Sequence, residues 1–136
     1  HTYFLIGDIR RAAVRGLKGV AIVDSLQADA RGAEPGDAIR FDKETDRVYG
    51  GAPDAMSLLD EVSNEELRIV KQGMADVVVW NPWIEKSRRM EDFGDDEFVR
   101  MVCVETGNID AAIELPASQA WSGVTRYSNR RQMIPA

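Results

Sequence analysis

The chain has 136 residues and a formal net charge of −6, with 44% hydrophobic and 29% charged residues. These values are typical of a globular domain with a real core, and the negative charge argues against the basic face that nucleic-acid binding requires. No apolar run in the sequence is long enough to cross a bilayer. Because Cys103 is the single cysteine, no internal disulfide can form, which favours a reducing compartment. We therefore expect a cytoplasmic domain that binds neither nucleic acid nor membrane.

The first third of the chain predicts short strands separated by turns. Residues 9–16 and 20–25 are expected to be strands, and residues 16–19, which begin and end with glycine, supply the turn between them. Residues 27–37 are rich in Ala, Gly, Asp and Pro, so they are expected to form a loop. Residues 38–41 alternate weakly between apolar and polar side chains and predict one more strand.

The middle of the chain continues this pattern, with strands expected over residues 56–62, 67–71 and 76–80. The last of these contains the run V-V-V-W, the β-branched and apolar composition of a buried strand. Asn81 and Pro82 then end it. Proline has no N–H for a ladder hydrogen bond, and it keeps the preceding residue extended.

A short helix and a run of acidic residues follow. Residues 84–90 can form two helical turns, and we expect the basic side chains there, including Lys86, to lie on a solvated face. The acidic residues of the 91–97 segment lack the fixed ligand spacing and the positioned glycine of a cation-binding loop, so helix capping is expected rather than a metal site. Residues 95–98 predict a second short helix.

Residues 99–105 predict a strand that is covered on both faces. Period two places Met101, Cys103 and Glu105 on one face, and the residues between them on the other. A carboxylate that closes such an apolar strand is a candidate for proton transfer, so Glu105 is the first candidate catalytic residue. The alternative is a strand-end carboxylate that simply emerges into water.

The last part of the chain predicts strands over residues 111–114 and 121–127, followed by a loose tail over residues 130–136. No internal repeat is present. Short strands that recur at a spacing of about ten residues, with turn signals between them, are typical of an all-β fold. We therefore expect an antiparallel β-sandwich with one or two short helices.

Five segments of the chain together resemble one enzyme family. They are H-T-Y-F at residues 1–4, T-D-R-V-Y at 45–49, V-V-W-N-P-W-I-E-K at 78–86, D-F-G-D-D-E-F at 92–98 and V-C-V-E-T-G at 102–107. They closely resemble segments of the hexose-6-phosphate mutarotases, also called glucose-6-phosphate 1-epimerases. These enzymes belong to the aldose 1-epimerase (galactose mutarotase-like) superfamily. The resemblance runs from residue 1 to about residue 128.

The resemblance implies roles for three side chains. Glu105 matches the catalytic base, and His1 matches the general acid, for which a frayed terminal residue is the alternative. Asp46 matches an aspartate that contacts sugar hydroxyls, whereas position alone would suggest an Asp46–Arg47 pair on a surface turn. No metal and no organic cofactor is implied.

Trp80 and Asn81 are further candidate substrate-binding residues. The indole of Trp80 could lie against the C–H side of a sugar, and packing between the sheets is the alternative. The side chain of Asn81 is either a sugar ligand or an amide that caps the turn after the strand. Both alternatives remain open for each residue.

The resemblance also implies that residues 1–136 are the C-terminal portion of a single aldose 1-epimerase-like domain, whose N-terminal half is absent. The implied activity is interconversion of the α and β anomers of a hexose 6-phosphate by acid–base ring opening and closure. The missing N-terminal half, supplied in trans, is a candidate partner. One alternative is a carbohydrate-binding β-domain without turnover, truncated and inactive alone. The other is a mutarotase that acts on free aldoses.

Overall fold

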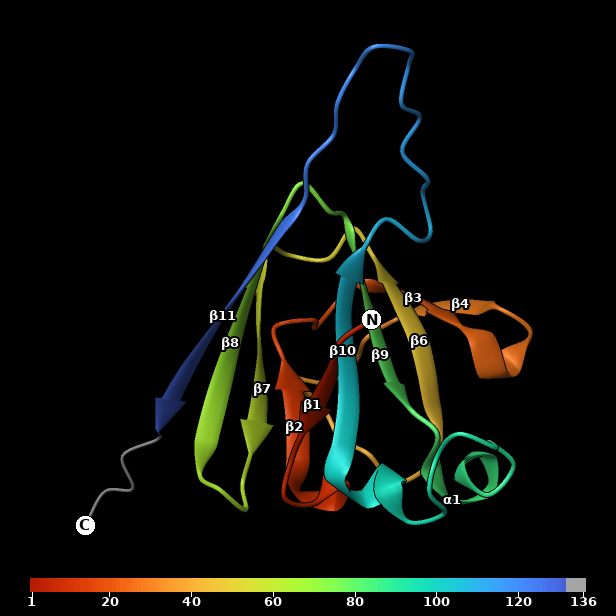
Figure 1. Ribbon diagram of the computed structural model, residues 1–136, viewed down its shortest axis with the longest axis vertical. Coiled ribbons are helices and arrows are strands. Elements are labelled where there is room, and N and C mark those ends of the chain that lie inside the picture. The colour runs from red at the N-terminus through yellow and green to blue at the C-terminus, as the bar shows by residue number, and fades with distance from the viewer. Residues whose placement is uncertain (132–136) are drawn as a thin grey trace.

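Backbone hydrogen bonds pair the strands into two antiparallel sheets, seen in the computed structural model of Figure 1. Successive residues of each strand point to opposite faces of its sheet. The structure describes residues 1–131. The six-stranded sheet contains, in spatial order, β1 (Tyr3–Leu5), β10 (Met101–Gly107), β9 (Asp76–Asn81), β6 (Thr45–Gly50), β3 (Ala21–Asp24) and β4 (Ala30–Ala33). The five-stranded sheet contains β11 (Val124–Arg131), β8 (Glu65–Gln72), β7 (Ala55–Asp60), β2 (Ala12–Arg15) and β5 (Ala38–Ile39). The expected all-β sandwich is confirmed.

Four short helices complete the described part of the chain. They are the 3-10 helices η1 (Ile9–Arg11), η2 (Ser25–Gln27) and η3 (Glu97–Arg100), and the α-helix α1 (Trp83–Ser87). The helix expected over residues 84–90 is therefore shorter than predicted, and 3-10-type bonds carry the chain on to Met90. Within residues 1–131, no helix is both long and apolar enough to span a bilayer.

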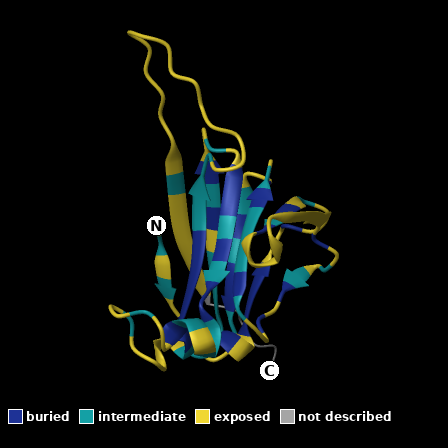
Figure 2. Cartoon of the chain, turned by 90° about the vertical axis from the view of Figure 1, so that its right-hand side faces the viewer, coloured by how far each residue is buried: buried dark blue, intermediate teal, exposed yellow. Residues whose placement is uncertain are grey.

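The core lies between the sheets, and each sheet turns one set of alternate residues toward it. Val77 and Val79 of β9 and Val102 and Val104 of β10 are fully buried there, against residues of β2, β7 and β8. Figure 2 shows these buried positions concentrated in the central strands, while β11 and the loop before it are exposed. Because side chains alternate, the residues between these valines form the opposite face of the six-stranded sheet.

Several sequence-based boundaries need correction. Residues 27–37 are not wholly loop, because β4 pairs with β3 over four residues although its own side chains are exposed. The expected strand over residues 111–114 is wrong. That segment belongs to a loop that extends away from both sheets (Figure 1), so no neighbouring strand is available to pair with it. Of the expected tail over residues 130–136, Arg130 and Arg131 belong to β11, and residues 132–136 lie outside the described part.

The turn over residues 16–19 connects the two sheets instead of closing a hairpin. It leads from β2 in the five-stranded sheet to β3 in the six-stranded sheet. Gly16 has a φ of 99°, and a Cβ there would lie 3.1 Å from the carbonyl oxygen of Ala55. Glycine is therefore required at this crossing.

Asp76 fixes the start of β9 to the loop that follows β10. Its carboxylate is 1% exposed and accepts hydrogen bonds from the backbone N–H groups of Gly51, Ile109 and Asp110. Burial alone would raise the pKa of Asp76, but these N–H groups outweigh it and lower the pKa below its usual value. The stabilisation is therefore present above the usual aspartate pKa and is lost as the pH falls through the lowered one.

We expect Asp76→Asn to lower the free energy of unfolding by about 2 kcal/mol at neutral pH, because three charge-assisted hydrogen bonds are weakened. Urea unfolding at about pH 7 and at about pH 3 should show this difference shrinking in acid, because below the usual aspartate pKa the unfolded state takes up a proton more readily than the folded state. Asp42→Asn is the matched control, because Asp42 is exposed. A difference that persists undiminished in acid would contradict this account of Asp76.

Candidate active site

The outer face of the six-stranded sheet brings His1 and Glu105 together. The Nδ1 atom of His1 lies 3.3 Å from the Oε1 atom of Glu105, although 104 residues separate them in sequence. The pairing of β1 with β10 causes this, because Tyr3 stands opposite Cys103 in an antiparallel register. Moving outward by two residues on each strand places His1 opposite Glu105, on the same face.

The two groups differ sharply in exposure. The Glu105 side chain is 18% exposed, whereas the His1 side chain is 89% exposed. A half-buried carboxylate beside an exposed imidazole can pass a proton within one hydrogen-bonded pair. Which ring nitrogen of His1 carries a proton depends on the tautomer.

Trp80 lies on the same outer face as Glu105. It belongs to a row of residues that crosses four neighbouring strands in the order Tyr3, Cys103, Trp80 and Asp46. Its indole is half-buried and meets the edge of the Tyr3 ring, with the ring centres 5.9 Å apart. Packing between the sheets, the alternative for Trp80, is therefore wrong. That alternative fits Trp83, whose ring lies 5.4 Å from the ring of Phe98 and contacts the core.

Asp46 stands on β6, two strands away from Glu105 and two residues further along the strand direction, so their Cα atoms are about 12 Å apart. It is not paired with Arg47, which turns to the other face and binds Asp24 at 3.2 Å. Burial raises the pKa of Asp46, and the nearby ammonium of Lys86 acts in the opposite direction. Asp46 and Glu105 thus stand on opposite sides of Val78 and Trp80, which occupy β9 between them.

Lys86 is only partly solvated, because it also contacts residues of this face. Its Nζ atom lies 3.4 Å from Glu44 and 3.9 Å from Asp46, and 5.7 Å from the centre of the Trp80 ring. The helix α1 folds back beside the strand that precedes it and brings Lys86 over Trp80. The only hint in the sequence is that just five residues, Pro82 among them, separate the two.

Asn81 is fully buried, and its amide groups are used inside the protein. Its Nδ2 atom donates to the carbonyl oxygens of Phe98 and Met101, both at 2.9 Å, and its Oδ1 atom accepts from the N–H of Trp83 at 2.9 Å. Trp83 has a φ of 55°, a conformation that a bulky residue rarely adopts. The structure thus favours the turn-capping role for Asn81, in which its side chain holds this strained turn.

Cys103 lies between Tyr3 and Trp80 and is completely buried. Burial, reinforced by the carboxylate of Glu105, raises the pKa of the Cys103 thiol to about 12. The thiol stays protonated at neutral pH, so it is not a nucleophile. Over the described residues, no three His, Cys, Asp or Glu side chains are grouped as metal ligands.

The sequence of this chain is similar to known proteins along most of its length. The aldose 1-epimerase family model matches residues 1–128. A protein of Cenchrus ciliaris named "Putative glucose-6-phosphate 1-epimerase" is 41% identical over 123 residues, which are 90% of this chain and 37% of that protein. A protein of the same name from Escherichia coli K12 is 39% identical over 107 residues, covering 78% of this chain and 36% of that protein.

Solved structures show the same arrangement of strands. A crystal structure of a "putative mutarotase" from Salmonella typhimurium has a TM-score of 0.79 and 25% identity, and it covers 97% of this chain and 44% of that one. A crystal structure of the protein HI1317 has a TM-score of 0.80 at 24% identity, covering 96% and 45%. The chain thus spans well under half the length of these relatives. By its match over residues 1–128, the chain belongs to the aldose 1-epimerase family.

Proposed function

We propose that this chain supplies the acid–base pair of a hexose 6-phosphate mutarotase, with Glu105 as the base and His1 as the acid. The observation that carries the proposal is the 3.3 Å contact between the two side chains on one face of the sheet. Membership of the aldose 1-epimerase family supports the reaction class. The preference for a hexose 6-phosphate is supported by the names of the relatives and by the W-N-P-W segment.

The proposed reaction moves two protons and changes no oxidation state. Glu105 removes the proton of the anomeric hydroxyl while His1 protonates the ring oxygen, so the ring opens to the aldehyde. Rotation about the C1–C2 bond presents the other face of the carbonyl, and reversal of both proton transfers closes the ring as the other anomer. Each positioned proton transfer accelerates such a reaction by about 10²- to 10⁴-fold. These two proton transfers need no cofactor.

The other residues of the face would bind the sugar. We propose that Asp46, as a carboxylate, accepts hydrogen bonds from sugar hydroxyls, and that the exposed part of Trp80 lies against the C–H face of the ring. Lys86 would keep Asp46 ionised and position it, because the ammonium lies 3.9 Å from the carboxylate. Asn81 would act indirectly, by holding the end of β9 in place.

A second candidate is a carbohydrate-binding domain without turnover. The 89% exposure of His1 favours it, because an exposed imidazole is poorly oriented for proton transfer. The chain also spans only 37% of its Cenchrus ciliaris relative, so groups that turnover requires could lie outside this segment. Calorimetric binding of glucose 6-phosphate without anomer exchange would identify this function, and comparison with free glucose would identify the preferred substrate.

We expect Glu105→Gln to slow the exchange between the α and β anomers of glucose 6-phosphate by about 10²- to 10⁴-fold, because the amide cannot accept the proton. Exchange spectroscopy by NMR measures this rate directly. Glu114→Gln, at an exposed position in the loop before β11, is the control and should keep the wild-type rate. Full activity in Glu105→Gln would exclude Glu105 as the base.

We expect Lys86→Met to act through the pKa of Asp46. Removing the positive charge leaves burial unopposed, so the pKa of Asp46 rises further. As the pH is lowered, KM for the sugar should therefore begin to rise at a higher pH than in the wild type, with kcat less affected. Arg88→Met is the control. Arg88 directly follows α1, and its exposed side chain pairs with Glu85 of that helix. An unchanged pH profile of KM in Lys86→Met would refute this role.

A further inference from the structure

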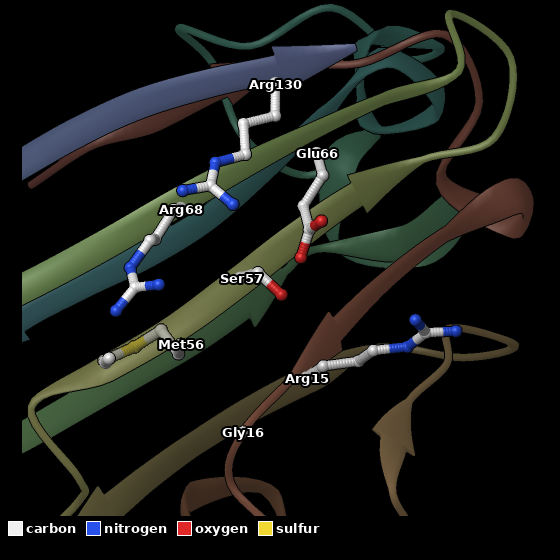
Figure 3. A pocket seen from close by; sticks show the side chains of 8 residues that line it. Arg15, Gly16, Met56, Ser57, Glu66, Arg68 and Arg130 are labelled. Carbon is white, nitrogen blue, oxygen red and sulfur yellow. The ribbon is translucent and has the colours of Figure 1, made fainter. Parts of the chain in front are cut away.

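The outer face of the five-stranded sheet carries a group of arginines around a hollow of about 290 Å³ (Figure 3). The polar residues lining the hollow are Arg15, Arg68, Arg130, Ser57 and Glu66. This face is turned away from the core, because the alternate residues of the same strands, such as Leu58 and Ile69, are buried. The sandwich therefore separates the arginine hollow from the His1–Glu105 pair.

The strand register places these side chains close together. Arg15 of β2 stands opposite Ser57 of β7, which stands opposite Arg68 of β8, so the three form one row. Residues directly opposite each other have their Cβ atoms about 5 Å apart. Arg130 of β11 is diagonal to Arg68, and Figure 3 shows their guanidinium groups on the same side of the Ser57 hydroxyl.

Within the described part of the chain, no acidic side chain is in ion-pair contact with any of the three arginines. Among residues 1–131, none of them forms an ion pair or a side-chain hydrogen bond, whereas Arg40 and Arg47 bind Glu61 and Asp24. Like charges that face one another on a sheet destabilise it. The arginines lack acidic partners even though the chain has 23 acidic and only 17 basic residues. Three unpaired guanidinium groups around one hollow are therefore suited to an anion that arrives from solution.

Glu66 restricts which anion fits. It stands opposite Arg130 in the register, and Figure 3 shows its carboxylate directed toward Ser57. A carboxylate at the wall repels a bare anion placed beside it, but it accepts hydrogen bonds from hydroxyl groups. A ligand that carries both a phosphate and hydroxyl groups satisfies the arginines and Glu66 together.

We propose that this hollow binds the phosphate ester of a polyhydroxy compound, such as a sugar phosphate, at a site separate from the proposed active site. The guanidinium groups of Arg68 and Arg130 bind the phosphate oxygens, since the planar fork of arginine matches an oxyanion in two-point contacts. Arg15 adds positive charge from the far side of Ser57, whose hydroxyl donates to a further phosphate oxygen. Glu66 accepts from a ligand hydroxyl.

The test is an NMR titration of the arginine Nε–Hε groups in the full chain with glucose 6-phosphate, inorganic phosphate and glucose. We expect saturable shifts of Arg15, Arg68 and Arg130 with glucose 6-phosphate, weaker binding of inorganic phosphate, and none of glucose. Arg68→Gln should weaken binding of glucose 6-phosphate about tenfold or more, because charge-assisted bonds are lost. Arg89→Gln, at an exposed arginine after α1, should leave it unchanged.

Three results would overturn the proposal: no saturation at the three arginines, equal weakening by Arg89→Gln, or equal affinity for inorganic phosphate and the ester. The midpoint of thermal unfolding provides a second measurement, because a ligand that binds only the folded state raises it. Glucose 6-phosphate should raise the midpoint less in Arg68→Gln than in the wild type. The titration reads the arginines directly and can be repeated in Glu105→Gln, so its failure is distinguishable from a failure of the proposed mutarotase activity.

Discussion

The candidate site depends on the pairing of β1 with β10. This pairing covers only three residues, and β1 lies at the edge of the six-stranded sheet. A short edge strand needs further contacts to stay in place, and the other sheet provides them. The ring of Phe4 meets the edge of the Tyr127 ring at 5.5 Å, and the hydroxyl of Thr2 lies 3.3 Å from that of Tyr127. The position of His1 thus relies on β11 as well as on β10.

The same sheet serves as a wall of the core on one side and as the floor of the site on the other. In β9, Val77 and Val79 are buried between the sheets, whereas Val78 and Trp80 face outward with Glu105. A shift of one residue in the register would exchange the two sets. The buried amide of Asn81 opposes such a shift, because it ties the end of β9 to the backbone of Phe98 in η3 and of Met101, the first residue of β10. An interior hydrogen bond therefore fixes the geometry of an exposed surface.

The sequence predicted the central strands well, because β9 and β10 contain unbroken runs of apolar, largely β-branched residues with turn signals beside them. It did not predict β4, whose side chains are exposed and which is ordered by pairing with β3. The candidate pair, His1 and Glu105, came from a family resemblance. The short distance between them in space could not be deduced from the sequence, because it follows from the pairing of β1 with β10, strands that lie far apart along the chain. Lys86 was missed because helical periodicity gives no information about how a helix folds back over a strand.

The charges on the site face limit how the proposed hexose 6-phosphate would bind there. Glu105 and Asp46 flank the floor, and Lys86 is already paired with Asp46 and Glu44. A phosphate dianion placed among these groups meets net negative charge, and low polarity near the sheet strengthens the repulsion. The face by itself therefore suits the neutral part of the sugar, with C1 toward Glu105 and the phosphate directed outward. In the proposed mutarotase, selectivity for a phosphate would have to come from cations beyond this face, and the relatives, which are more than twice as long, have further chain that could provide them.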